Sequence, residues 1–238
     1  MNKRLKKQQK KDLQTFFGKP YVLVFALLLF ACATIKLAFT ISRESATGIW
    51  KFTLIFDTIT TLLLSSSLFL FYMSSDTKAK EGAKIAAVTF IVASSLSIFT
   101  QLAFVIYIAT FFEIIPTILT ILCFFIPTLF QLRFSIYLMR DVFKNKIRAK
   151  GAGEYAGTKI FALVPAFLIK YMDFDVVNTT PVINVKLFLT PFESSNAMDT
   201  SYPTLAFICL IVTSGSLAAF SLLYNKFAIE YEKENTEQ

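Results

Sequence analysis

Apolar runs long enough to cross a lipid bilayer recur along this chain, and they constrain its fold more than any other feature. At least five of them occur within 238 residues, and a transmembrane helix requires about 20 predominantly apolar residues. The hydrophobic share of 55% also exceeds the roughly 45–50% of soluble domains. A helix satisfies its backbone hydrogen bonds within a single span. We therefore predict an all-α, polytopic integral membrane protein in a lipid bilayer.

Six transmembrane helices are predicted, and five of them follow directly from the apolar runs. These five cover residues 20–41, 49–73, 83–110, 114–139 and 203–224. The sixth segment, 156–172, has an uninterrupted apolar part of only ten residues, Ile160–Ile169. It crosses the bilayer if the flanking Lys159 and Lys170 reach the headgroups, and it is otherwise re-entrant or interfacial. We expect it to cross.

The chain is interpreted as one membrane domain, because no segment is long and polar enough for a separate soluble domain. The predicted parts are a basic cytoplasmic tail at 1–19, a membrane domain at 20–224 that includes an extracytoplasmic loop at 173–202, and an acidic cytoplasmic tail at 225–238.

Basic residues are distributed unequally between the two sides of these spans. With a cytoplasmic N-terminus, eighteen Lys and Arg residues lie on the cytoplasmic side and four on the other. Such a bias is typical of cytoplasmic loops, and with six spans it predicts that both termini are cytoplasmic. The basic tail is expected to contact anionic lipid, with its Phe16 and Phe17 at the membrane interface. No folded basic face or aromatic platform indicates nucleic-acid binding.

The second predicted span carries the one carboxylate embedded in these apolar runs, Asp57. A charge at the centre of a span costs about 2.5–3.5 kcal/mol on insertion scales and usually faces protein or water. Thr53, Thr61 and Ser65 lie at four-residue steps from Asp57, so on a helix they share one face with it. This polar face makes Asp57 the first functional candidate and the three hydroxyl residues candidate lining of a path.

Three further polar residues are expected near Asp57. Lys36 and Asp57 lie about five and eight residues from the outer ends of their spans, or roughly 8 and 12 Å deep at 1.5 Å per residue. Gln101 lies at a similar depth and Glu113 near the outer rim. This predicted cluster of Lys36, Asp57, Gln101 and Glu113 is interpreted in two ways: as a site for a cation, proton or polar solute, or as an ion pair that locks the first two spans together.

Two other spans carry patterns of their own. On the fourth span, Thr120, Thr128 and Gln131 recur on one face by helical spacing and are further candidates for path lining. On the last span, Gly215 and Ala219 lie four residues apart, which permits close approach of another helix, within the chain or between subunits. Both patterns are compatible with a path and with a packing surface.

Several classes of activity lack the residues they need. The chain has no histidine, no Walker A sequence and no nucleotide-binding glycine fingerprint. Its three cysteines, Cys32, Cys123 and Cys209, lie in apolar runs without metal-binding spacing. We therefore expect neither an enzyme nor a protein with a metal or organic cofactor.

Two functions remain. The first is a permease- or channel-type subunit that moves a small solute, ion or lipid, within an oligomer or a larger complex. The second is a structural, assembly or scaffolding subunit of a membrane complex. A path predicts a wettable polar cavity that reaches Asp57, whereas a scaffold predicts that Lys36 neutralises Asp57 in a dry interface. The sequence does not indicate which membrane the protein occupies.

Overall fold

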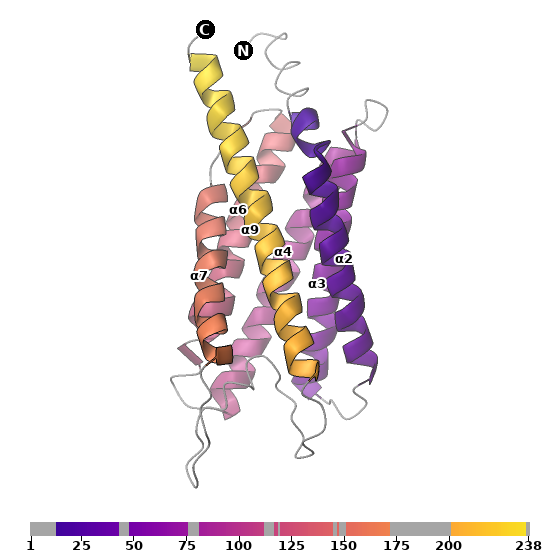
Figure 1. Ribbon diagram of the computed structural model, residues 1–238, viewed down its shortest axis with the longest axis vertical. Helices are drawn as coiled ribbons and strands as arrows, with labels where there is room; N and C mark the ends of the chain where they lie inside the picture. The colour runs from indigo at the N-terminus through magenta and orange to yellow at the C-terminus, as the bar shows by residue number, and fades with distance from the viewer. Residues whose placement is uncertain are drawn as a thin grey trace.

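The computed structural model describes residues 13–42, 48–75, 81–111, 117–118, 120–144, 147, 151–171 and 201–236. These residues form helices and no strand. The elements are α2 (Pro20–Ser42), α3 (Gly48–Met73), α4 (Gly82–Phe111), the π-helix η1 (Ile121–Phe125), α6 (Ile126–Lys144), α7 (Ala152–Tyr171) and α9 (Ser201–Thr236). They lie side by side in one bundle (Figure 1). Glu113 and nearly all of the predicted 173–202 loop lie outside the described residues.

Five of the described helices are long and apolar enough to cross a membrane. Their apolar segments are Pro20–Ala38, Phe52–Met73, Gly82–Ile106, Ile121–Lys144 and Ile208–Lys233. Large apolar side chains remain exposed along these helices, for example Phe30 of α2 and Phe99 of α4. Phe161 of the adjacent α7 is exposed as well. This pattern fits an integral, multi-pass membrane protein. The segment predicted at 156–172 is helix α7, which begins earlier, at Ala152, and packs against α6 and α9.

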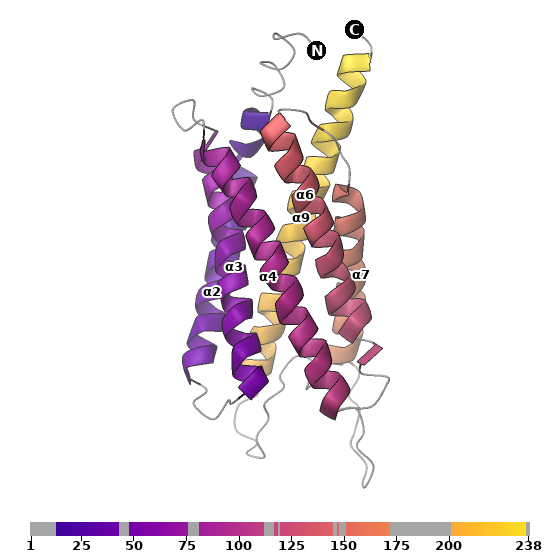
Figure 2. The ribbon, with the colours of Figure 1, turned by 180° about the vertical axis from the view of Figure 1, so that it is seen from behind.

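The long helices form a closed ring. Around it, α2 contacts α3, α3 contacts α4, α4 contacts α6, α6 contacts α7, α7 contacts α9, and α9 returns to α2. The two opposite views agree with this order, with α9 in front in Figure 1 and α4 in front in Figure 2. A ring of this size has a central axis that side chains must fill or leave open.

Aromatic side chains fill this axis at the end of the bundle where the first and last described residues lie, which we call the terminal end (Figure 1). The helical turn at residues 13–17 contributes Phe16 and Phe17, both fully buried. Phe17 stacks on Phe71 with ring centroids 4.3 Å apart, and Phe16 stacks on Phe227 at 4.9 Å. The predicted interfacial position of Phe16 and Phe17 is therefore wrong, because both rings are inside the bundle.

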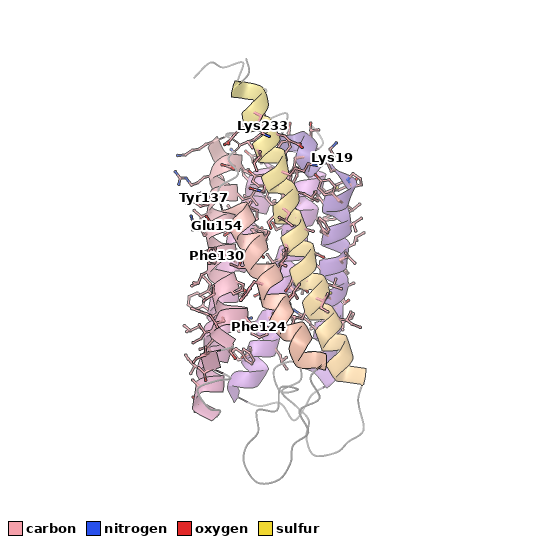
Figure 3. All side chains as sticks on the ribbon, turned by 60° about the vertical axis from the view of Figure 1, so that its left-hand side comes forward. Lys19, Phe124, Phe130, Tyr137, Glu154 and Lys233 are labelled. Atoms are coloured by element: carbon pink, nitrogen blue, oxygen red, sulfur yellow. The ribbon has the colours of Figure 1, made fainter. Side chains whose placement is uncertain are left out.

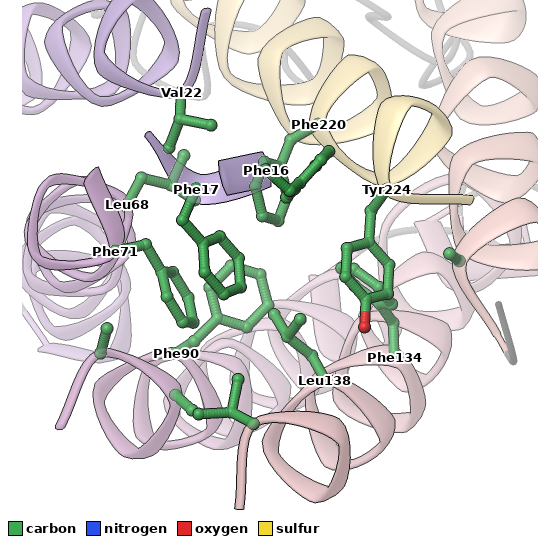
Figure 4. Close-up of a cluster of buried hydrophobic side chains, with 14 of the residues drawn as sticks. Phe16, Phe17, Val22, Leu68, Phe71, Phe90, Phe134, Leu138, Phe220 and Tyr224 are labelled. Atoms are coloured by element: carbon green, nitrogen blue, oxygen red, sulfur yellow. The ribbon is translucent and has the colours of Figure 1, made fainter. Parts of the chain in front are cut away.

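We call this group the terminal aromatic cluster. Its rings come from the N-terminal turn and from four helices of the ring (Figure 4). Its members are Phe16, Phe17, Phe71, Phe90, Phe134, Phe220 and Tyr224, with Leu68 and Leu138 packed beside them. Because each ring buries a large apolar area, the cluster ties the N-terminal turn to the bundle.

Two helices differ from the predicted spans. Before α6, the backbone N–H of Ile126 donates to the carbonyl of Ile121, five residues back. Pro127 follows, and its ring would clash with the carbonyl four residues back in a regular α-helix. A wider π-turn relieves that clash, and such turns are frequent at functional sites. At the other end of the chain, α9 continues to Thr236, twelve residues beyond the predicted end of the last span.

Asp141 is a further carboxylate within a long helix, and it is buried, because α6 continues to Lys144 rather than ending near Met139. The Tyr224 hydroxyl donates a hydrogen bond of 2.6 Å to Asp141 Oδ2 at the edge of the terminal aromatic cluster. The expectation that Asp57 is the one embedded carboxylate is therefore wrong. Asp141 follows Arg140, and the two charges together made this part of the sequence resemble a polar link.

Candidate functional site

A polar cavity of about 80 Å³ lies inside the ring, with walls from all of its long helices. We call it the chamber. Its polar lining residues are Lys36, Asp57, Thr60, Thr61, Ser97, Gln101, Thr128, Gln131, Lys159, Thr213 and Ser214. A buried water molecule needs roughly 10–15 Å³ of such space, so the chamber has room for several waters or one small solute.

Lys36 and Asp57 form an ion pair in the chamber wall. Lys36 Nζ lies 2.8 Å from Asp57 Oδ2 and donates a second bond, of 3.0 Å, to Thr61 Oγ1. The hydroxyl of Thr61 in turn donates to the backbone carbonyl of Asp57 at 2.8 Å. The expected contact between α2 and α3 is therefore present, and one hydroxyl of the predicted polar face completes it.

Among the described residues, apolar side chains do not fully enclose the ion pair. The Asp57 side chain is 39% exposed and that of Lys36 is 20% exposed. Asp57 nevertheless lies on the same helical face as Thr53, Thr60 and Thr61, which are all buried. Asp57 also lines the chamber, so part of its surface borders that cavity.

Lys159 is the functional candidate that sequence reasoning missed. The sequence predicts that it reaches the headgroups at the edge of the segment 156–172, but it lies in α7 and lines the chamber. No hydrogen bond or ion pair joins its ammonium to the described residues, and its Nζ lies 5.9 Å from the centroid of the Tyr155 ring. It is close enough to Lys36 and Asp57 to interact with both charges.

A sequence signal for Lys159 does exist. Ala152, Tyr155, Ala156 and Ala162 are the buried residues of this helix, and they recur at three- and four-residue steps that include position 159. This helical period begins eight residues before the apolar run at Ile160, within a segment rich in glycine and charge. Tracking the period rather than the hydropathy would have placed Lys159 on the inner face.

Three chamber-lining side chains have buried polar atoms without a hydrogen-bond partner among the described residues: Gln101 Oε1, Thr60 Oγ1 and Thr213 Oγ1. A buried polar atom that is left unsatisfied costs about 1–3 kcal/mol. Such atoms in the wall of a polar chamber are suited to bind its contents. Gln101 was predicted at this depth, whereas Thr60 lies one position from the predicted polar face.

Gln131 closes the chamber towards the terminal aromatic cluster. Its Nε2 donates to Ser94 Oγ at 3.3 Å, and Tyr155 donates to its Oε1 at 3.1 Å. The Tyr155 ring stacks on Phe134 of the cluster with centroids 5.6 Å apart. The amide therefore joins α4, α6 and α7 in a polar layer between the chamber and the aromatic rings.

Half of the predicted path-lining residues reach the chamber. Thr61, Thr128 and Gln131 line it, whereas Thr53, Ser65 and Thr120 are buried elsewhere. Ser65 instead donates a 2.8 Å hydrogen bond to the carbonyl of Ala26, so it joins α3 to α2.

The predicted packing face of the last span does not pack within the described chain. A Cβ atom added to Gly215 would meet no atom within 4 Å, and Ala219 is partly exposed. The buried small residues of this part of α9 include Ser214, Ser216 and Ala218 instead. Close approach at Gly215 within the chain is therefore not observed, and contact with another subunit stays a prediction.

A second ion pair lies on the flank of the bundle. Arg133 Nη1 is 2.6 Å from Glu154 Oε2, and both side chains are about half exposed. Glu154 lies at a level between Phe130 and Tyr137, away from the terminal end marked by Lys19 and Lys233 (Figure 3). Arg133 of α6 thus has a protein partner in Glu154 of α7.

Comparison with known proteins found no match: no family model, no curated protein and no solved structure matches this chain. The chemistry of the chamber therefore stands on its own residues. It offers two ammonium groups, one carboxylate, two amides and several hydroxyls. No group of three or more His, Cys, Asp and Glu suited to a metal ion occurs in the part of the chain that the structure describes. Reversible binding of a small polar solute is the chemistry that these groups support.

Proposed function

We propose that this chain is a non-enzymatic, permease-type membrane protein that binds a small polar solute in the chamber during passage. The observation that carries the proposal is the chamber itself, with Lys36, Asp57 and Lys159 brought together from three helices. A charge within a span costs about 2.5–3.5 kcal/mol on insertion scales. A chain that needed only to hold its helices together would fill the ring axis with apolar side chains, as it does in the terminal aromatic cluster.

The proposed topology has six spans, with α7 among them, and both termini in the cytoplasm. Removing Lys159 from the cytoplasmic link leaves seventeen basic residues on that side against four on the other. The bias still supports this orientation. The terminal aromatic cluster then closes the chamber towards the cytoplasm, and transport requires the N-terminal turn to move.

The chamber lies nearer the other end of the bundle. Lys36 is six residues from the end of α2, and Asp57 is nine residues from the start of α3. We propose that solute enters from this outer side and that anionic lipid binds the basic tail at the cytoplasmic side.

A scaffolding role within an oligomer or larger complex is the second candidate. The observation that favours it is the Arg133–Glu154 pair, whose half-exposed charges lie on a flank that otherwise carries apolar residues. Another subunit that covers this flank would shield both charges from lipid. The two candidates differ in whether water reaches the chamber.

Thiol labelling tests water access to the chamber. In a chain with Cys32, Cys123 and Cys209 replaced by alanine, Gln101→Cys places a thiol at the chamber wall. The matched control is Phe99→Cys, two residues away on the same helix but 65% exposed on its outer face. A charged, membrane-impermeant thiol reagent should label only Gln101→Cys, and only from the outer side of oriented vesicles. Equal inertness of both thiols from both sides would contradict the proposal.

Solute flux in proteoliposomes tests the function itself. Stopped-flow light scattering would follow osmotic volume changes with a panel of small anions, cations and neutral solutes, at fixed membrane potential. The protein should raise the flux of at least one class of solute above that of empty liposomes. The Asp57→Asn variant should raise this flux less than the unaltered protein does. Absence of flux for every class, with intact protein, would contradict the proposed function.

A further inference from the structure

We propose that the solute carries an oxyanion group, a carboxylate or phosphate, and that the ammonium of Lys159 is its principal contact in the chamber. This inference rests on the proposed function for its biological meaning, but binding of the anion is a separate observation. It follows from the charge balance, the hydrogen-bonding groups and the size of the chamber.

The charge balance of the described lining favours an anion. Lys36 and Asp57 are 2.8 Å apart and neutralise one another. Lys159 then adds a positive charge, and no other carboxylate lines the chamber among the described residues. A cation would have to displace Lys36 from Asp57 and would be repelled by Lys159. An anion would instead bind the ammonium of Lys159, which forms no ion pair with the described residues.

The hydrogen-bonding groups that line the chamber together with Lys159 suit an oxyanion. An oxyanion accepts several hydrogen bonds, and those from ionised donors are the strongest. The Thr60 hydroxyl has no partner among the described residues, so it can donate to a guest. The Gln101 amide, whose oxygen is also without a partner, can turn its NH₂ towards the chamber. Gln131, by contrast, is already held by Ser94 and Tyr155.

The size of the chamber restricts the class further. A volume of about 80 Å³ suits a carboxylate or phosphate group with few attached atoms. Lys159 lies seven residues into α7, so the anion would be held well inside the ring rather than at its rim. A solute with one small anionic head is therefore favoured over a bulky one.

Binding to purified full-length protein tests this site. Calorimetry and thermal shift would use sodium formate, acetate and phosphate as probes, with choline chloride and urea as non-oxyanion controls. At least one oxyanion should bind, and Lys159→Gln should weaken its binding at least tenfold, while Lys159→Arg retains most of it. Lys84→Gln, an exposed basic residue outside the chamber, should bind as the unaltered chain does. Unchanged binding in Lys159→Gln, or no oxyanion binding at all, would overturn the inference.

A second measurement keeps the test decisive if Lys159→Gln does not fold. Ser97→Cys, in the chain without other cysteines, places a thiol in the chamber wall and leaves Lys159 intact. A bound oxyanion should slow its labelling, whereas choline chloride at the same ionic strength should not. Labelling that no oxyanion slows would refute the site.

Comparison of free and lipid-borne anions separates the two sources of the same chemistry. Glycerol phosphate and a short-chain phosphatidic acid carry the same phosphate head, and both should require Lys159. If the lipid slows labelling of Ser97→Cys more than glycerol phosphate does, the natural ligand is a lipid headgroup. If glycerol phosphate slows it more, the natural ligand is a free solute. Oxyanion binding without solute flux would contradict the proposed function but support this binding site. Solute flux without oxyanion binding would support the proposed function but contradict this binding site.

Discussion

Lys36 Nζ lies 2.8 Å from Asp57 Oδ2, and this contact joins α2 to α3 in the wall of a polar chamber. The pair is only partly buried, because the side chains of Lys36 and Asp57 are 20% and 39% exposed, and both residues line the chamber. The ion pair either holds two helices together or takes part in solute passage. Substitutions at these two residues can distinguish the two roles.

Asp57→Asn should destabilise the protein by about 1–3 kcal/mol, since it leaves the Lys36 ammonium without its counter-charge; partial exposure of the pair keeps the cost below that of a fully buried one. The double variant Lys36→Met with Asp57→Asn should recover most of this stability, measured by thermal denaturation in detergent. Solute flux should stay low in the double variant. Full recovery of flux together with stability would assign the pair a purely structural role.

Phe17→Ala should destabilise the bundle by about 3–5 kcal/mol, the usual cost of removing a buried ring. Phe17 is fully buried against Phe71, so its loss should also open the terminal end. Thiol labelling of Gln101→Cys should then occur from the cytoplasmic side as well. Phe99→Ala, which removes an equal ring from the outer surface, should change neither property. One-sided labelling in folded Phe17→Ala would show that the cluster does not close the chamber.

The sequence was sufficient for those features that depend on local pattern. Apolar length located the helices, and the depth of Lys36 and Asp57 in adjacent spans predicted their contact. Features that depend on the whole ring were missed. Phe16 and Phe17 lie beside seven basic residues, which suggests an exposed tail. Their burial could be predicted only from the arrangement of the helices that meet at the terminal end.

Lys159 and Asp141 were missed for a related reason. Charged residues near a weakly apolar segment resemble a link, yet both belong to helices whose inner faces continue past the apolar runs. The π-turn at Ile121–Phe125 was not predicted either, because hydropathy carries no information on a one-residue change of helical register.

Gly18→Ala should destabilise the protein by about 1–3 kcal/mol through overpacking. A Cβ atom at Gly18 would lie 2.9 Å from the Cβ and Oγ atoms of Ser75, which fixes how closely the N-terminal turn approaches the end of α3. Gly157→Ala is the matched control, because nothing lies within 4 Å of its added Cβ in helix α7; it should stabilise by roughly 0.5–1 kcal/mol. Thermal denaturation would compare them, and equal shifts would show that the turn does not pack tightly on Ser75.

Tyr224→Phe should destabilise the protein by about 1–3 kcal/mol, because it leaves the buried carboxylate of Asp141 without the hydroxyl that now donates to Oδ2 at 2.6 Å. The double variant Tyr224→Phe with Asp141→Leu should be more stable than Tyr224→Phe alone, since it removes the carboxylate as well. Tyr72→Phe, the same chemical change on a partly buried ring at the same end of the bundle, serves as the control. A loss in Tyr224→Phe no larger than that in Tyr72→Phe would mean that Asp141 does not depend on this hydrogen bond.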